Sequence, residues 1–275
     1  MNKTKTQQAI DARIEERQGS SFRRHLGASL IGHPCSRYGW YVFRWAKAVR
    51  HRARLLRLFD RGELEEQRFV RWLRDAGVHV VTHDPNTGKQ YRVSDHDEHF
   101  GGSLDAALFD TPDFPATWVL GEFKTHNAKS FKELTQKGVK AAKFQHYVQM
   151  QIYMHYTGMP FAIYFAICKD DDALHIEVVE YAPEVAEMYI ERAGKIIRST
   201  VPPERVANAS PGWFLCSWCD FKDICFDDAP MAVNCRTCKY SSPREQGTWA
   251  CQQRGISLTD AAQRKACELY TPITG

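Results

Sequence analysis

Glu122 and Lys124, separated by one residue, are of the types that support phosphate-ester hydrolysis when they are held side by side. They lie within residues 117–124, a segment rich in β-branched and aromatic residues that predicts a β-strand. Side chains alternate along a strand, so Glu122 and Lys124 share one face and Phe123 points to the other, into a core. On the shared face the carboxylate can bind a divalent cation, while the ammonium can orient the attacking water and neutralise charge on the phosphorus oxygens.

A second carboxylate, Asp105, lies in another predicted strand, residues 100–109, whose early glycines let backbone or substrate approach closely. Two carboxylates from neighbouring strands form a hard oxygen site of the kind that magnesium and manganese prefer. Downstream, residues 143–156 predict a helix, in which residues four apart share a face. Gln149 and Tyr153 are therefore expected to face the site together and to contact a substrate phosphate or base.

Each of these motifs also has an ordinary structural explanation. A Glu-x-Lys triplet occurs about once by chance in a chain of this length, and a Gln-x-x-x-Tyr helix is more often simply amphipathic. The catalytic interpretation is favoured by the order of the motifs: a strand with one carboxylate, a strand with Glu-x-Lys, a helix with Gln and Tyr, then another strand.

In these motifs, residues 35–225 resemble the PD-(D/E)XK nuclease superfamily, specifically its RecB-like branch. Residues 147–158 also look like the corresponding helix of lambda-exonuclease-type phage recombination nucleases. The resemblance implies a fold of the α/β (α+β) class, with a central mixed sheet flanked by helices. It also implies site roles: metal ligands Asp105 and Glu122, catalytic Lys124, and the helix residues Gln149 and Tyr153.

A third acidic residue is expected from the amphipathic helix predicted over residues 53–76. In the family that the chain resembles, an acid or histidine four positions after a glycine often reaches the metal. Counting from Gly62 gives Glu66, and Glu65 is the second choice. An exposed surface acid is the alternative for each of them.

The rest of the chain agrees with that fold. A strand is predicted at residues 78–82, a buried strand at 161–168 and an outer strand at 174–181, followed by a helix at 183–200. With the site strands and helices, the order is α-β-β-β-α-β, which is the core order of the nuclease fold that the chain resembles.

Length and composition set limits on the class of protein. The chain has 275 residues, 43% of them hydrophobic and 25% charged, as expected of a globular protein. Its longest apolar run, residues 161–168, is too short to span a membrane, and its polar N-terminus has no signal-peptide core. We expect a soluble protein of the bacterial cytoplasm with two domains, a nuclease domain at 1–228 and a small module at 229–275.

The charge distribution is more informative than the net charge of +4. Residues 36–59 contain seven Lys or Arg residues and no acid, and residues 124–143 contain six lysines and one acid. Two basic stretches beside an acidic metal site suit DNA, although either one can be an ordinary solvated face. The aromatic residues that lie among Arg37 and Arg44 can stack on bases, although most of them are better explained as core.

Nine cysteines in a cytoplasmic protein indicate metal ligands more than disulfides. Cys216, Cys219 and Cys225 form a tight trio with a fourth partner available in Cys35, and thiolates at such spacings can hold an iron–sulfur cluster. Zinc on the same four thiolates is the alternative. Four aromatic residues nearby are expected to form an apolar shell: Phe214, Trp218, Phe221 and Phe226.

This cysteine arrangement resembles iron–sulfur RecB-like nucleases, including CRISPR spacer-acquisition nucleases. The resemblance implies a 4Fe–4S cluster on Cys35, Cys216, Cys219 and Cys225, which closes the nuclease core as a structural staple.

A second set of cysteines, with C-x2-C spacing followed by two more thiols, predicts a structural zinc site. Its segment has too few apolar residues to fold on a core of its own, so metal would supply folding energy. Four unrelated thiols are the alternative, and DNA, a partner protein or another subunit could contact the module. The four residues are Cys235, Cys238, Cys251 and Cys267, which leave Cys168 as a buried free thiol.

The expected function is a magnesium- or manganese-dependent DNA exonuclease in phage or mobile-element recombination. DNA is its expected partner, and a recombination protein is a candidate second partner. No phosphate-binding loop of an ATPase motor is present in the sequence. The alternatives are a DNA-binding module without turnover, a sequence-specific endonuclease and an iron–sulfur redox protein. The sequence leaves open the cleavage polarity, the strand preference and the oligomeric state.

Overall fold

The computed structural model describes residues 3–273 and divides into two compact units, each assembled from segments far apart in the sequence. The sheet unit comprises the N-terminal residues up to Gly19 together with Arg50–Val93 and Ser103–Glu187. The cysteine unit comprises the remaining described segments, including everything from Met188 onward. The domain boundary predicted after residue 228 therefore falls inside the cysteine unit.

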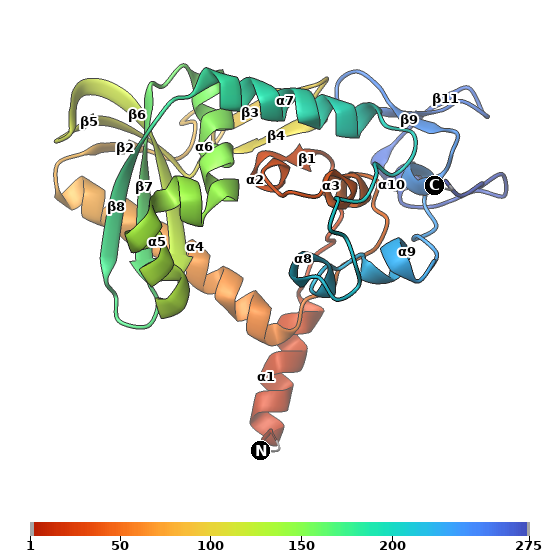
Figure 1. Cartoon of the computed structure of the whole chain (residues 1–275), viewed down its shortest axis with the longest axis horizontal. Coiled ribbons are helices and arrows are strands. Elements are labelled where there is room, and N and C mark those ends of the chain that lie inside the picture. The colour runs from red at the N-terminus through yellow and green to blue at the C-terminus, as the bar shows by residue number, and fades with distance from the viewer. Residues whose placement is uncertain (1–2, 274–275) are drawn as a thin grey trace. The chain divides into compact units, whose positions relative to one another are not determined.

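A five-stranded mixed sheet forms the centre of the sheet unit, in the order β2-β5-β6-β7-β8 (Figure 1). All neighbouring strands are antiparallel except β6 and β7, which are parallel and are joined by a helical crossover. This agrees with the predicted mixed sheet flanked by helices. The elements are β2 (His79–Val81), β5 (Ala106–Thr111), β6 (Phe114–His126), β7 (Phe161–Cys168), β8 (Leu174–Glu180), α1 (Lys5–Glu16), α4 (Ala53–Asp75), α5 (Ala128–Ala142) and α6 (Phe144–Thr157).

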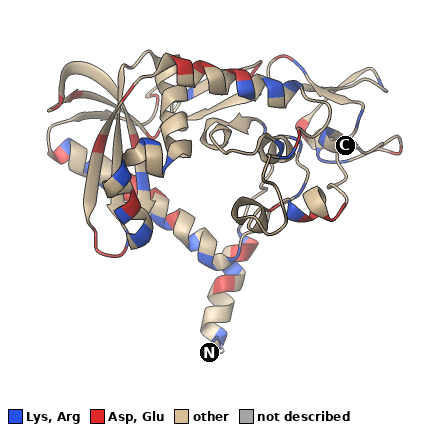
Figure 2. Ribbon diagram, viewed as in Figure 1, with Lys and Arg blue, Asp and Glu red and all other residues tan. Residues whose placement is uncertain are grey.

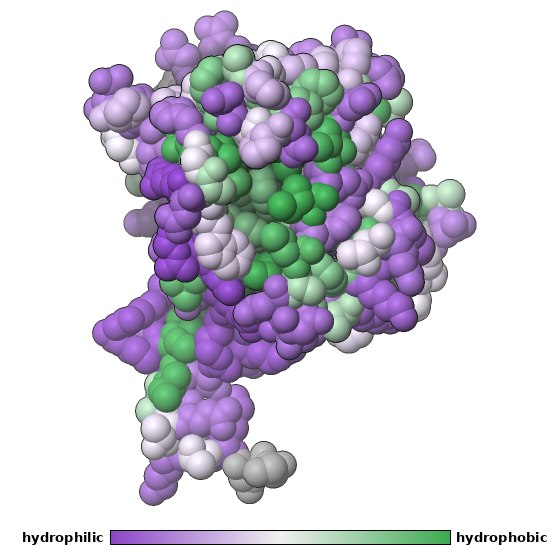
Figure 3. All heavy atoms as spheres, turned by 90° about the vertical axis from the view of Figure 1, so that its left-hand side faces the viewer, coloured by the Kyte–Doolittle hydropathy of each residue, from purple (hydrophilic) through white to green (hydrophobic). Residues whose placement is uncertain are grey.

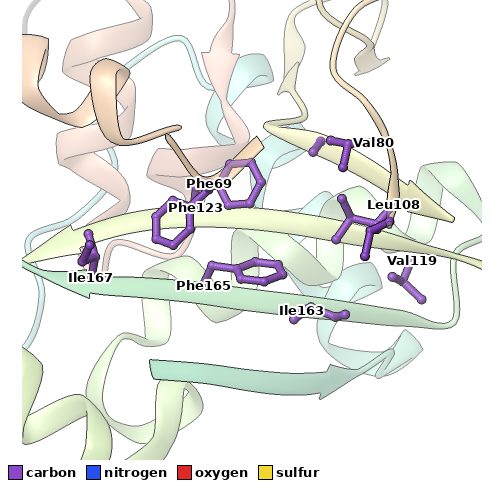
Figure 4. Close-up of a cluster of buried hydrophobic side chains, with 10 residues drawn as sticks. Phe69, Val80, Leu108, Val119, Phe123, Ile163, Phe165 and Ile167 are labelled. Carbon is purple, nitrogen blue, oxygen red and sulfur yellow. The ribbon is translucent and has the colours of Figure 1, made fainter. Parts of the chain in front are cut away.

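Helix α4 covers one face of this sheet with a hydrophobic core (Figure 4). The ring of Phe69 in α4 stacks on Phe123 of β6, with centroids 5.2 Å apart. Phe123 is buried, as predicted, so its neighbours Glu122 and Lys124 point to the opposite face, where α5 and α6 pack. Apart from its first residue, β7 is buried along its whole length because it has strands on both sides and helices on both faces.

The edge strand β8 alternates between the two faces. On the α5 side, the carboxylate of Glu177 accepts a hydrogen bond from the backbone N–H of Val139 at 2.9 Å. This hydrogen bond lies next to a kink in α5 at Gly138. The φ of Gly138 is 73°, in a region that glycine adopts freely and other residues rarely adopt. On the other face, Leu174 and Ile176 remain exposed. Figure 3, viewed from the side of β5 and β8, shows hydrophobic side chains gathered near its centre.

The cysteine unit contains short elements and much irregular chain. The ring centroid of Phe43, in the helix Ser36–Phe43, lies 5.3 Å from that of the buried Trp249. The segment after residue 228 therefore shares a core with residues 20–49. The remaining elements of the chain are β1 (Leu26–Gly27), α2 (Ala28–Ile31), α3 (Ser36–Phe43), β3 (Arg92–Asp95), β4 (Phe100–Ser103), α7 (Pro183–Arg198), α8 (Phe214–Ser217), α9 (Lys222–Phe226), η1 (Cys235–Thr237), β9 (Ser241–Pro243), β10 (Trp249–Cys251), β11 (Ile256–Leu258) and α10 (Asp260–Gln263).

Two arginines are buried in this core without a carboxylate. Arg44 is only 1% exposed and donates to the carbonyls of Ser199 and Ser241, each at 3.0 Å. The guanidinium carbon of Arg236 lies 3.8 Å from the ring centroid of Trp45. Burial lowers the pKa of Arg44 to about 10 and that of Arg236 to about 9. Arg44 is therefore a structural residue, and most of the aromatic residues around it are buried, as expected of core residues.

Within residues 3–273, no helix is both long enough and apolar enough to cross a lipid bilayer.

Candidate active site

Asp105 lies in a bend rather than within a strand. The predicted strand at 100–109 is interrupted at Leu104 and Asp105, so that β4 ends before them and β5 begins after them. The bend places Oδ2 of Asp105 2.9 Å from the backbone nitrogen of Phe123 and 3.2 Å from Nζ of Lys124, and both groups donate to it. The prediction of one continuous strand was wrong, and the interruption is what brings Asp105 to β6.

Glu122 is fully buried beside Asp105. Its carboxylate forms an ion pair with Lys124, yet neither of its oxygens has a hydrogen bond of good geometry with any described residue. Burial and the negative charge of Asp105 raise the pKa of Glu122 to about 8. A buried carboxylate so poorly supplied with donors is costly unless a cation compensates its charge.

Lys124 is held by two hydrogen bonds and one ion pair. Its ammonium contacts Oδ2 of Asp105, a carboxylate oxygen of Glu122 and, at 3.0 Å, the carbonyl of Phe123. Burial alone would lower the pKa of Lys124, but the two carboxylates outweigh burial and raise the pKa above its usual value. Lys124 is therefore a firmly held cation.

Of the acids on α4, Glu66 is the one whose charge is coupled to this group. Burial and the charge of Asp105 raise the pKa of Glu66 to about 7. Glu65 is instead paired with Arg68, with Oε2 and Nη1 3.2 Å apart. The structure thus brings Glu66, rather than Glu65, into electrostatic contact with Asp105.

Two adjoining hollows open the site to solvent, and both have Glu63, Glu66 and Phe123 in their walls. We call them together the site hollow. The first is also lined by Asp105, and the second by Lys124 and His146. The ribbons of α4 and α5 carry several Lys and Arg residues, coloured blue in Figure 2. Two of them, Arg71 and Arg74, line the first hollow.

Gln149 and Tyr153 lie on one face of α6, as expected, but both are almost fully buried. The amide of Gln149 contacts the hydroxyl of Tyr153 at 3.5 Å, and neither residue lines the site hollow. Burial and the charge of Glu122 raise the pKa of Tyr153 above its usual value. Both side chains are therefore buried beside the catalytic group and are not exposed in the site hollow.

Sequence reasoning did not connect three residues on this face of the sheet, His126, His146 and Tyr164. The Tyr164 hydroxyl lies 2.9 Å from Nε2 of His126 and 2.8 Å from Nδ1 of His146. His146 was detectable in principle, because it precedes Gln149 by three residues on the same helical face. The contact with Tyr164 joins α6 to β7 and depends on the tertiary fold.

The four cysteines of the predicted iron–sulfur set all line one cavity in the cysteine unit: Cys35, Cys216, Cys219 and Cys225. Burial and then the nearby Cys35 raise the pKa of the Cys219 thiol. Phe221 and Phe226 also line this cavity. Phe214 and Trp218 are 74% and 82% exposed, so the prediction that they belong to the apolar shell is wrong. Helix α8 is a single short turn and cannot bury every side chain around it.

The four cysteines of the predicted zinc site line another cavity of the same unit: Cys235, Cys238, Cys251 and Cys267. Burial and then the neighbouring thiol of Cys238 raise the pKa of Cys235 to about 11. Cys168 is free and buried at the end of β7. Within the described part of the chain, no group of three or more His, Cys, Asp or Glu side chains is arranged so that it could hold a metal ion as it stands.

No protein-family model matches the sequence, and no curated protein matches it. The chain is similar to a solved alkaline exonuclease, LHK-Exo from Laribacter hongkongensis, with 18% identity, coverage of 69% of this chain and 90% of that chain, and a TM-score of 0.44. It is also similar to a phage-related exonuclease from Haemophilus somnus 129PT, with 17% identity, coverage of 49% and 66%, and a TM-score of 0.34. A third similar structure, SSO0001, has 14% identity, coverage of 82% and 98%, and a TM-score of 0.48. All three TM-scores are low, and function is inferred below from the site itself.

Proposed function

We propose that this chain is a metal-dependent deoxyribonuclease that hydrolyses phosphodiester bonds. One observation carries the proposal: Asp105 and Glu122 meet Lys124 beside an open hollow, with Glu66 coupled to them from α4. A lysine whose charged form is stabilised by two carboxylates, next to a solvent-accessible hollow, can support phosphodiester hydrolysis.

The donor set fits a divalent cation. All three acidic side chains are hard oxygen ligands of the kind that magnesium and manganese prefer. Repulsion from Asp105 contributes to the raised pKa of both Glu66 and Glu122, and the oxygens of Glu122 lack sound hydrogen bonds from described residues. A bound cation would offset the repulsion between the carboxylates and would give the oxygens of Glu122 a partner. It would also polarise the phosphate and lower the pKa of a bound water.

The protein side chains have distinct roles in this proposal. Lys124 orients the attacking water and offsets charge on the phosphorus oxygens. Asp105 fixes the position of Lys124 and of the β6 backbone, in addition to offering a ligand oxygen. Gln149 and Tyr153 lie behind the catalytic group, where the buried hydroxyl of Tyr153 is electrostatically coupled to Glu122.

Several finer assignments belong to the same proposal. The resemblance of residues 147–158 supports an exonuclease that acts on DNA in phage or mobile-element recombination, inside a bacterial host cell. The gathering of each cysteine set around one cavity supports a 4Fe–4S cluster on the first four thiolates and zinc on the second four. Both would stabilise the fold and take no part in hydrolysis.

The proposal is tested with end-labelled linear DNA and closed circular DNA, each incubated with magnesium or manganese. Wild type is compared with Lys124→Ala and with a control, Lys137→Ala, which removes an exposed lysine paired only with Glu133. We expect loss of linear DNA from an end by wild type and the control, and none by Lys124→Ala. Cleavage of the circle would indicate an endonuclease. DNA binding without cleavage by wild type would replace the proposal with a binding module.

A further inference from the structure

A chain of hydrogen bonds runs through four side chains on the site face of the sheet. It begins at Oγ of Ser130, which lies 3.0 Å from Nδ1 of His126. It continues from Nε2 of His126 to the hydroxyl of Tyr164 at 2.9 Å, and from that hydroxyl to Nδ1 of His146 at 2.8 Å. Nothing in the proposed hydrolysis uses these groups.

The chain lies next to the catalytic group because of strand register. Tyr164 on β7 is the direct partner of Glu122 on β6, so the two side chains share a face. His126 follows Lys124 by two residues on the same strand and points to that face as well. Tyr164 and His126 are both buried, whereas His146 is only half-buried.

His146 connects this buried chain to the site hollow. Its ring lines the hollow together with Glu66 and Lys124. Its Nδ1 is occupied by Tyr164, while its Nε2 has no hydrogen-bond partner among residues 3–273. Burial and the charge of Lys124 lower the pKa of His146 to about 3, so the ring is neutral and only one of its nitrogens carries hydrogen.

The hydrogen-bond chain allows two arrangements of its hydrogens. If Ser130 donates to His126, then His126 donates to Tyr164, Tyr164 donates to Nδ1 of His146, and the hydrogen of His146 is on Nε2. In the opposite direction the hydrogen of His146 is on Nδ1, and the hydroxyl hydrogen of Ser130 has no acceptor among the described residues. Only the first direction places the N–H that lacks a protein acceptor at the site hollow, where a substrate can accept from it.

We propose that His146 binds a phosphate group of the nucleic-acid substrate through its Nε2–H, and that Tyr164, His126 and Ser130 position it by fixing its tautomer. The inference rests on the proposed nuclease function and adds a substrate contact to it. A neutral imidazole N–H suits a phosphate oxygen, which only accepts hydrogen bonds.

The kinetic test compares His146→Ala and Tyr164→Phe with wild type on a phosphorylated oligonucleotide in the presence of magnesium. The chain offers a matched control: His155 on the same helix bonds Tyr181 through Nδ1 at 2.8 Å, and neither residue lines the site hollow. We expect KM to rise about 3- to 10-fold in His146→Ala, the usual effect of one lost hydrogen bond, and by a smaller factor in Tyr164→Phe, which keeps the imidazole and only redistributes its tautomers. We expect kcat to change by less than about 2-fold, and His155→Ala and Tyr181→Phe to keep the wild-type KM.

A second measurement separates the inference from the function on which it rests. NMR of the histidine side-chain nitrogens reports the tautomer of His146 without any DNA. We expect hydrogen on Nε2 in wild type and a mixture of tautomers in Tyr164→Phe. Hydrogen on Nδ1 in wild type, or an active enzyme whose KM is unaffected by His146→Ala, would overturn the inference and leave the nuclease proposal intact. A wild type that neither binds nor cleaves DNA would overturn the nuclease proposal, and the substrate contact with it.

Discussion

The carboxylate of Asp105 accepts a hydrogen bond from the backbone N–H of Phe123 at 2.9 Å. This contact ties the bend before β5 to the middle of β6, next to Glu122 and Lys124. Because Phe123 is anchored on its other side by the aromatic core under α4, the position of Asp105 depends on that core. One bond thus joins the packing of the sheet unit to the geometry of its candidate site.

Replacing Asp105 separates its structural role from its chemical one. Asp105→Asn keeps an oxygen that can accept from Phe123 but removes the charge, so we expect cleavage to fall by at least about 100-fold. Its free energy of unfolding should stay close to wild type. Asp105→Ala removes both roles and should also destabilise by about 1–2 kcal/mol. Urea unfolding alongside cleavage rates checks this, and equal stability of the two variants would argue against the anchoring role.

Stability without metal should depend on pH through Glu122 and Glu66. Their pKa values rise from 4.5 to about 8 and about 7 in the folded protein, so the folded state holds more protons than the unfolded state between these values. Their contribution to stability is therefore complete below about pH 4.5 and is lost as pH rises through 7 and 8. Magnesium binds the ionised carboxylates, so its stabilising effect should grow over the same range.

The measurement is the melting temperature at a series of pH values, with and without magnesium. Glu122→Gln serves as the matched variant, because it cannot ionise and should flatten the pH dependence. If the metal-free wild type becomes more stable as pH rises across this range, the predicted direction of the pH dependence is wrong. Equal stabilisation by magnesium at acidic and alkaline pH would contradict its linkage to these carboxylates.

The two cysteine sets should lose their metals independently. Cys35→Ser should abolish the brown colour and the iron content of an anaerobic preparation while zinc remains, since its thiol lines only the first cavity. Cys251→Ser should remove zinc and leave iron. The measurement is the iron and zinc content of wild type and of both purified variants, determined by elemental analysis. Zinc alone in wild type would reassign the first set, and iron retained by Cys35→Ser would exclude Cys35 as a ligand.

Arg236 should be essential to the stability of the cysteine unit. It donates to the side chain of Gln263 at 2.9 Å and to the carbonyls of Arg24 and Phe43 at 3.0 and 3.1 Å. Arg236→Met leaves these acceptors without a donor, so we expect a loss of about 2–4 kcal/mol in the free energy of unfolding. Lys195→Met, which removes an exposed lysine paired with Glu191, is the control and should cost less than about 1 kcal/mol. Similar losses in the two variants would refute the role of Arg236.

Local periodicity was sufficient to predict several features from the sequence. Alternation along β6 placed Glu122 and Lys124 on one face and Phe123 in the core, and the unbroken apolar run of β7 predicted a buried strand. The shared face of Gln149 and Tyr153 followed from helical geometry. These features depend on neighbours within a few residues, which is the range over which a sequence pattern is informative.

Other features were decided only by contacts between distant segments. The bend at Asp105 exists because its carboxylate bonds β6, and Glu66 rather than Glu65 is coupled to Asp105 because of how α4 lies beside the strands. Likewise, the burial of Arg44 required acceptors from residues more than 150 positions away. The type of a residue and its local spacing indicate which chemistry its side chain can perform. Its actual partner is set by the packing of the whole chain, because burial and hydrogen-bond satisfaction are properties of the folded protein.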